Sequence, residues 1–211
     1  MFGRLFDRVA PLWRAAATVG DIIVINLLLL VTAVPIVTLG AGLTAVYDTA
    51  RRLQTDLDDG AARAFWRSFR SNLGQATALW TVVGVAGCGV LASWIFVRMP
   101  ELAVLKVLIT GIYLLIFPFV WAMQARFENT VWRTLRNAAA IALGRLPYAC
   151  GVLAIQALVI STTVATWILL PQAVVLLLLL GYPLAVWAST PMIEKALRPL
   201  LGPVDPAAHS S

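Results

Sequence analysis

Few residues in this chain belong to the types that enzymes use for acid–base or nucleophilic chemistry. The only histidine is His209, close to the C-terminus, so a histidine-based triad or a histidine metal site has nothing to build on. The sequence has no GxSxG, HExxH or P-loop pattern, and a nucleophile–base pair is not visible. We therefore expect no catalytic residue, no metal site and no cofactor, and predict that the protein is not an enzyme.

Two glycine patterns match the dinucleotide-binding pattern GxGxxA, one beginning at Gly40 and the other at Gly87. The dinucleotide mechanism requires the pattern between a strand and a helix, and neither has that setting. The net charge of +6 and the pI near 10.0 would suggest nucleic acid in a soluble protein. Here the arginines lie between apolar runs, which is the pattern of membrane topology. We expect no nucleotide site and no nucleic-acid partner.

Three polar residues lie within apolar runs, namely Asn26, Lys106 and Gln156. Such residues are costly in a bilayer and are often functional. For Asn26 and Gln156 we favour interhelical hydrogen bonds, and Lys106 is close enough to a helix start to reach the headgroups. No acidic residue occupies mid-membrane, which argues against ion-coupled transport but leaves a passive pore open.

The elements that hold these residues are membrane helices. Hydrophobic residues make up 61% of the chain, charged residues 12%, and the mean hydropathy is +0.88. We predict an all-α, polytopic membrane helical bundle in one domain, 1–211. The predicted hydrophobic segments, about five in number, cover 20–46, 76–97, 102–124, 147–170 and 172–192. The remaining parts are an amphipathic N-terminal helix at 1–19, basic connections at 48–75 and 126–145 with short amphipathic interfacial helices, and a tail at 194–211.

The first hydrophobic segment is interrupted by Pro35, which cannot donate a backbone hydrogen bond. We favour a single kinked crossing. The alternative is a re-entrant hairpin that turns between Pro35 and Gly42. Cys88 and Cys150 show no metal-ligand spacing, and we expect both to be buried.

The basic residues also predict which side of the membrane each connection faces. The two long connections and the tail carry five, four and two basic residues, so we expect them in the cytoplasm. Five crossings would then place the N-terminus outside. That placement conflicts with its own three arginines, whereas the hairpin alternative would bring the N-terminus inside.

Three blocks of sequence carry a family pattern. The first is an asparagine, an apolar run, Pro-Ile-x-Thr-x-Gly, a small-residue segment and a tyrosine; it falls on Asn26, Pro35, Ile36, Thr38, Gly40, Ala45 and Tyr47. The second is FWRSFRSNLGQA, with Phe65, Phe69 and Asn72, and the third is RFENTVWRTLRNAAAIALGRLP, with Phe127, Asn129, Asn137, Ala138 and Pro147. Together the blocks resemble the YesL-like bacterial membrane proteins, a domain of unknown function. Leu73 stands where the pattern leads us to expect an aromatic residue.

The resemblance implies a bacterial plasma-membrane protein that is often encoded beside carbohydrate ABC importers, and it implies no activity. It directs attention to two sets of residues. The candidate functional motif is Asn26, Pro35, Thr38, Gly40, Thr44 and Tyr47. The candidate partner-binding residues are Phe65, Phe69, Asn72, Phe127 and Asn137.

Two functions remain open from the sequence. The first is a non-enzymatic accessory or regulatory protein that lies in the lipid bilayer and binds ABC permease subunits or a second copy of the chain. The second is a small passive transporter or channel for an uncharged solute, lined by Asn26, Thr38, Thr44 and Gln156.

Overall fold

The structure is a computed structural model, and it describes residues 2–55, 60–170 and 174–200, although not the side chains of 2–12, 14 and 174–178. Within those ranges the chain forms helices and no strand, which confirms the predicted all-α class. The helices are α1 (Phe2–Ala33), α2 (Leu39–Thr55), α3 (Ala61–Phe96), α4 (Ala103–Arg126), α5 (Val131–Gly144), α6 (Leu146–Leu169) and α7 (Val174–Leu197). Short 3-10 turns cover Ile36–Thr38, Pro100–Leu102 and Arg198–Leu200. The predicted tail lies mostly outside the described residues.

Among the described residues, four helical stretches are long and apolar enough to cross a membrane. They are Ala15–Ala33, Ala61–Phe96, Pro100–Arg126 and Leu146–Leu169. Their length and composition make this a multi-pass membrane protein. The fifth predicted segment, 172–192, lies partly outside the described side chains and coincides with α7. Cys88 and Cys150 are exposed, which corrects the expectation that both are buried.

Two predicted elements merge into the single helix α3. The interfacial helix and the following membrane segment form 36 continuous residues, because Gly74 alone separates them and one glycine costs a helix only about 1 kcal/mol. A helix of this length spans about 54 Å, well beyond the ~30 Å of hydrocarbon. Its arginine-rich first third therefore extends past the apolar layer.

Pro35 ends α1 and turns the chain back on itself. The Thr38 hydroxyl donates to the carbonyl oxygens of Thr32 and Pro35, so the turn satisfies backbone groups that a membrane would leave unpaired. A Cβ built on Gly42 would lie 3.9 Å from the Cβ of Thr32, so α2 runs back along α1. The favoured single kinked crossing is therefore corrected, and the structure has the hairpin.

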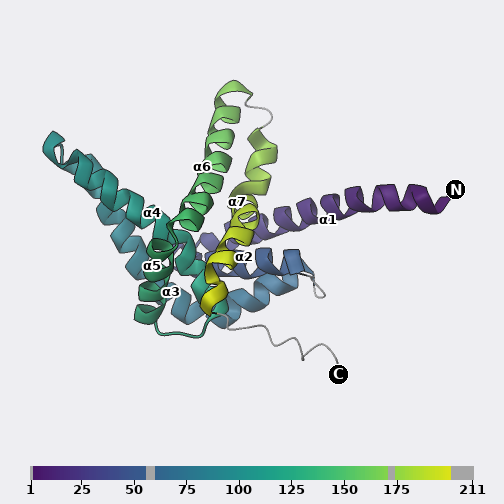
Figure 1. Cartoon of the computed structure of the whole chain (residues 1–211), viewed down its shortest axis with the longest axis horizontal. Coiled ribbons are helices and arrows are strands. Elements are labelled where there is room, and N and C mark those ends of the chain that lie inside the picture. Colours follow the sequence, from purple (N-terminus) through teal and green to yellow (C-terminus); the bar gives the residue numbers. More distant parts are fainter. Residues whose placement is uncertain (1, 56–59, 171–173, 201–211) are drawn as a thin grey trace.

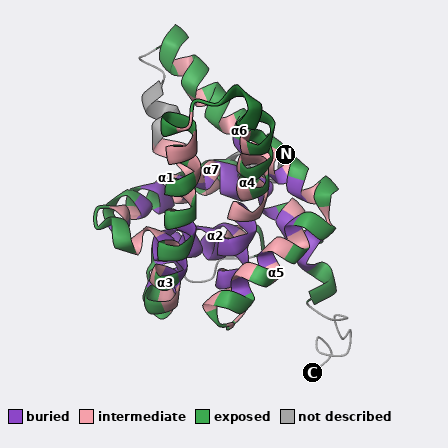
Figure 2. Cartoon of the chain, turned by 90° about the vertical axis from the view of Figure 1, so that its left-hand side faces the viewer, coloured by how far each residue is buried: buried purple, intermediate pink, exposed green. Residues whose placement is uncertain are grey.

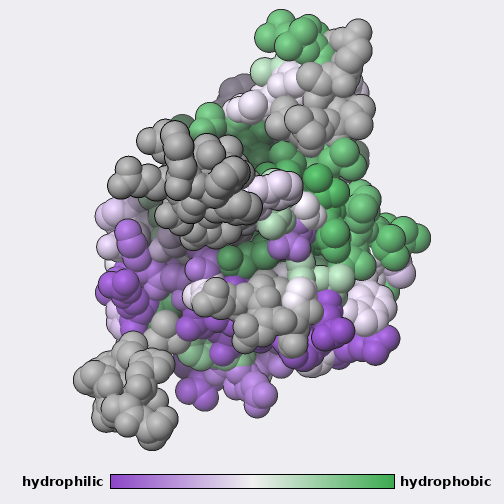
Figure 3. Space-filling view, turned by 90° about the vertical axis from the view of Figure 1, so that its right-hand side faces the viewer, coloured by the Kyte–Doolittle hydropathy of each residue, from purple (hydrophilic) through white to green (hydrophobic). Residues whose placement is uncertain are grey.

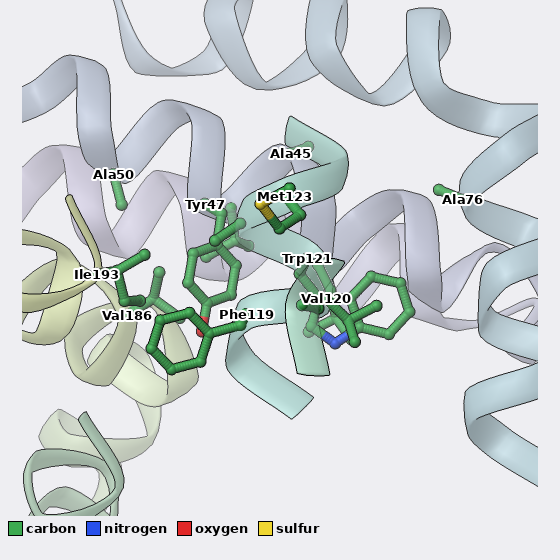
Figure 4. Close-up of a cluster of buried hydrophobic side chains, with 14 of the residues drawn as sticks. Ala45, Tyr47, Ala50, Ala76, Phe119, Val120, Trp121, Met123, Val186 and Ile193 are labelled. Carbon is green, nitrogen blue, oxygen red and sulfur yellow. The ribbon is translucent and has the colours of Figure 1, made fainter. Parts of the chain in front are cut away.

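Helix α2 forms the centre of the fold. All residues from Gly40 to Ala50 are buried, and Figure 2 shows α2 as the central buried helix. Figure 4 shows Tyr47 on this helix facing Phe119 of α4 and Val186 of α7. A Cβ on Gly40 would come within 2.4 Å of the Ala76 carbonyl oxygen, so only glycine lets α2 approach α3 this closely.

Two helical pairs extend from this centre in different directions, α3 with α4 and α6 with α7 (Figure 1). In the first pair, the Tyr113 hydroxyl donates to the Val83 carbonyl oxygen at 3.2 Å, and the Trp94 indole donates to the Thr110 hydroxyl at 3.0 Å. Lys106 donates to the carbonyl oxygen of Val97 near the tip of the pair. Exposed apolar side chains cover α3, α4 and α6 where these helices extend from the centre, as expected of helices that face lipid.

Candidate functional site

Asn26 supports a break in α7. Gly181 there has φ 48° and ψ −150°, a backbone conformation that only glycine adopts readily. The Asn26 amide donates to the Leu179 carbonyl oxygen at 3.0 Å. A Cβ on Gly181 would lie 2.5 Å from the Asn26 oxygen. Asn26 thus satisfies a carbonyl group at the break and leaves no room for a larger residue.

Tyr47 joins three helices through a buried polar cluster. Its hydroxyl lies 3.3 Å from the hydroxyl of Tyr182 on α7. The Gln156 amide on α6 donates to the same Tyr47 oxygen at 3.3 Å. Asn26 and Gln156 therefore both make interhelical hydrogen bonds, as the sequence predicts.

The other motif residues shape the packing around this cluster. Pro35 and Thr38 form the turn, and Gly40 allows the close approach of α2 to α3. Thr44 is fully buried and donates to the Gly40 carbonyl oxygen at 2.9 Å. We name the six motif residues, with Gln156, Gly181 and Tyr182, the motif core. Each of the four residues expected to line a passage makes a hydrogen bond within the protein, and their role in a passage stays a prediction.

The predicted partner-binding residues are buried or half-buried. Phe65 is 0% exposed and Phe69 9%, so both side chains pack inside the protein. Amphipathic spacing marked their shared face, but the fold covers that face with other helices. Asn72, Phe127 and Asn137 are half-buried. Exposed aromatic side chains near these positions are Trp66 on α3 and Trp132 on α5, and partner binding here stays a prediction.

A polar pocket of about 750 Å³ lies where α2, α3 and the end of α4 meet. We name it the junction pocket. Its lining residues are Asp48, Arg51, Arg52, Arg67, Ser68, Ser71, Asn72, Gln75, Gln124, Ala125, Arg126, Phe127 and Glu128. Figure 3 shows hydrophilic residues gathered on the lower part of one face of the molecule, below apolar residues.

The charges in the junction pocket are held in place by ion pairs. Asp48, whose side chain is 8% exposed, accepts from Arg51 Nη2 and from Arg52 Nε, both at 3.0 Å. Arg126 pairs with Glu194 of α7. Four arginines and two acidic residues line the pocket, and with Glu194 beside Arg126 these charges sum to +1. The arrangement therefore favours an anion.

Uncharged hydrogen-bonding groups form the rest of the pocket wall. The Gln124 amide donates to the Asn72 side-chain oxygen at 3.2 Å, and the Asn72 amide donates to the Ser68 carbonyl oxygen at 2.9 Å. Gln124 is 4% exposed, and its side-chain oxygen has no hydrogen-bond partner. Such amide groups can bind a ligand through hydrogen bonds.

Sequence reasoning missed this pocket because its residues come from separate segments. Its arginines were explained by membrane topology alone. One local signal was available: Asp48 ends an apolar run, and Arg51 and Arg52 follow at the helical spacings i+3 and i+4. Across the described ranges, no group of three or more His, Cys, Asp or Glu side chains is placed to hold a metal ion.

The fold and these sites define a multi-pass α-helical membrane protein. Residues 22–94 match the family model described as a protein of unknown function, DUF624, which is the YesL-like family. This match confirms the resemblance read from the first two blocks. It covers the end of α1, all of α2 and most of α3, whereas the third block lies beyond it. No curated protein and no solved structure matches the chain.

Proposed function

We propose that this protein is a non-enzymatic accessory protein of the bacterial plasma membrane that binds the permease subunits of a carbohydrate ABC uptake system. The observation that supports a binding role is an exposed tryptophan beside exposed arginines on each of two helices. The link to carbohydrate uptake comes from the family resemblance.

The first of these surfaces lies on α3. Trp66 is 37% exposed, and the Arg70 guanidinium carbon lies 5.2 Å from the centre of a Trp66 ring. Arg63 is exposed on the same side of the helix. Tryptophan and arginine are the residues most often found to anchor protein interfaces.

The second surface lies on α5. Trp132 is 74% exposed, and Arg133 and Arg136 are exposed beside it. Both surfaces belong to the basic connections, which the positive-inside rule assigns to the cytoplasm. A partner that reaches both would bind at the cytoplasmic side of the bilayer.

The test is co-purification of the tagged protein from its native host in mild detergent, with bound proteins identified by mass spectrometry. We expect stoichiometric recovery of carbohydrate permease subunits. Trp66→Ala and Trp132→Ala should each weaken permease binding about thirtyfold and reduce that recovery accordingly, since loss of an aromatic anchor costs about 2 kcal/mol or more. Trp167→Ala is the matched control, because Trp167 is an exposed tryptophan near the far end of α6.

Recovery of the protein without permease subunits would contradict the proposal. Equal loss of recovery in all three variants would also contradict it, because it would mean that the two basic surfaces have no special role.

A further inference from the structure

We propose that the junction pocket binds a phosphate ester that also carries free hydroxyl groups. Two sources supply this chemistry: a soluble phosphorylated polyol, or the headgroup of a phosphoglycerol lipid. The lining of the junction pocket includes neither Trp66 nor Trp132, so ligand binding there can be tested separately from permease binding.

The first argument is the way the arginines are fixed. Asp48 accepts one N–H from Arg51 and one from Arg52, and Glu194 accepts one from Arg126. A guanidinium group has five N–H donors, so each arginine keeps donors that its ion pair does not use. Fixed guanidinium groups of this kind bind phosphate more strongly than mobile ones do.

The second argument is the hydroxyl and amide wall opposite this charge. Ser68, Ser71, Asn72, Gln75 and Gln124 all line the pocket. The unpartnered, buried oxygen of Gln124 requires a donor, and a ligand hydroxyl would supply one. The volume of about 750 Å³ falls within the roughly 300–1,000 Å³ of small-molecule sites, so there is room for more than a bare phosphate.

The third argument is the surface next to the pocket. Arg67 and Ser71 also line a neighbouring groove of about 920 Å³ between α1 and α3. That groove has an apolar floor that includes Leu28, Val31 and Trp66. A lipid could place its headgroup in the junction pocket and an acyl chain along this groove. The adjacency is the reason to test a lipid source together with a soluble one.

The experiment uses the full-length protein and two probes. The first is glycerol 3-phosphate, measured by calorimetry with protein in neutral detergent. The second is phosphatidylglycerol, measured as lipid retained in native mass spectrometry after reconstitution in phosphatidylglycerol–phosphatidylcholine bilayers. Binding of glycerol 3-phosphate would assign a soluble source. Retention of phosphatidylglycerol alone, above phosphatidylcholine, would assign a lipid.

Variants decide whether the binding takes place in the junction pocket. Arg52→Gln should weaken binding of either probe about tenfold through loss of a charge-assisted contact, while Asp48 keeps its bond to Arg51. Arg133→Gln on α5 is the control and should leave binding unchanged. If Arg52→Gln does not fold, Arg52→Lys serves in its place and should weaken binding about threefold, because lysine lacks the planar donor fork.

A separate variant tests the hydroxyl contact. Gln124→Met should weaken the binding of glycerol 3-phosphate and leave the binding of inorganic phosphate unchanged. Absence of binding by both probes would overturn the proposal. Binding that Arg52→Gln weakens no more than Arg133→Gln would overturn it as well.

Discussion

The motif core and the junction pocket both include residues of the central helix α2, but they differ in how far their polar groups are satisfied by hydrogen bonds. In the motif core the side chains of Asn26 and Tyr47 bond to other helices, and Thr44 bonds within α2. In the junction pocket, Arg51 Nε and the side-chain oxygen of Gln124 have no hydrogen-bond partner. The difference indicates that the family motif shapes the α1–α2 hairpin, whereas Arg51 and Arg52, just after it, provide the donors for the proposed ligand.

The two regions are joined by the direction of α2. The turn at Pro35 and the close approach at Gly40 place α2 against α3. Arg51 and Arg52, one to two turns beyond Tyr47, then face Ser68 and Ser71 across the junction pocket. If the motif sets this geometry, substitutions in the motif core should lower the free energy of unfolding. Substitutions of the pocket arginines should weaken ligand binding.

The largest effect is expected from Gly40→Ala. The new Cβ would lie 2.4 Å from a backbone oxygen of α3, and α2 would have to move away from the core. We expect a loss of about 3 kcal/mol in unfolding free energy, the upper part of the range for overpacking. The measurement is thermal or denaturant unfolding in detergent. Gly89→Ala is the control, since nothing lies within 4 Å of its new Cβ, and equal stability of the two variants would contradict this packing.

Asp48→Asn should have an intermediate effect. It removes the charge that accepts from both Arg51 and Arg52, and charge-assisted hydrogen bonds contribute about 1.5–3 kcal/mol. Because both arginines are partly exposed, we expect a loss of about 2 kcal/mol in the same unfolding assay. Glu101→Gln, at an exposed position in the turn before α4, should change stability by less than about 0.5 kcal/mol. If Asp48→Asn left the unfolding free energy unchanged, the ion pairs of Asp48 would not stabilise the fold around the junction pocket.

Tyr47→Phe should have the smallest effect. It removes one hydroxyl from two hydrogen bonds of 3.3 Å, a loss of about 1 kcal/mol. Glycerol 3-phosphate binding should stay at the level of the natural protein. A double-mutant cycle with Tyr182→Phe should show coupling between the two hydroxyls, and full additivity would mean that they do not interact. A large loss of glycerol 3-phosphate binding in Tyr47→Phe alone would contradict the separate roles of the motif core and the junction pocket.

The sequence could predict the helices but not how they fold together. The long apolar runs predict membrane segments, and Pro35 marks a break. The direction of the chain after Pro35 depends on the packing of Gly40 and Gly42 against distant residues, which no local pattern contains. Amphipathic spacing likewise identified the face of Phe65 and Phe69, but not that other helices bury it.

The sequence likewise indicated part of the motif core but not the junction pocket. Asn26 and Gln156 could be recognised because a polar residue in an apolar run is unusual. Arginines after a membrane segment are common and have an ordinary explanation in topology. Only the fold shows that Arg52 and Arg126, from connections far apart in the chain, line one pocket.

The most direct test of the account is a disulfide between positions 32 and 42. The protein carries Thr32→Cys and Gly42→Cys, with Cys88 and Cys150 replaced by serine, and the linked peptides are quantified by mass spectrometry after mild oxidation. The hairpin places the two Cβ atoms about 3.9 Å apart, within disulfide range. A continuous helix would separate the two residues by about 15 Å. We predict near-complete cross-linking, with none for a Gly20→Cys and Gly42→Cys control pair; no cross-link at 32 and 42 would contradict the hairpin and the pocket that depends on it.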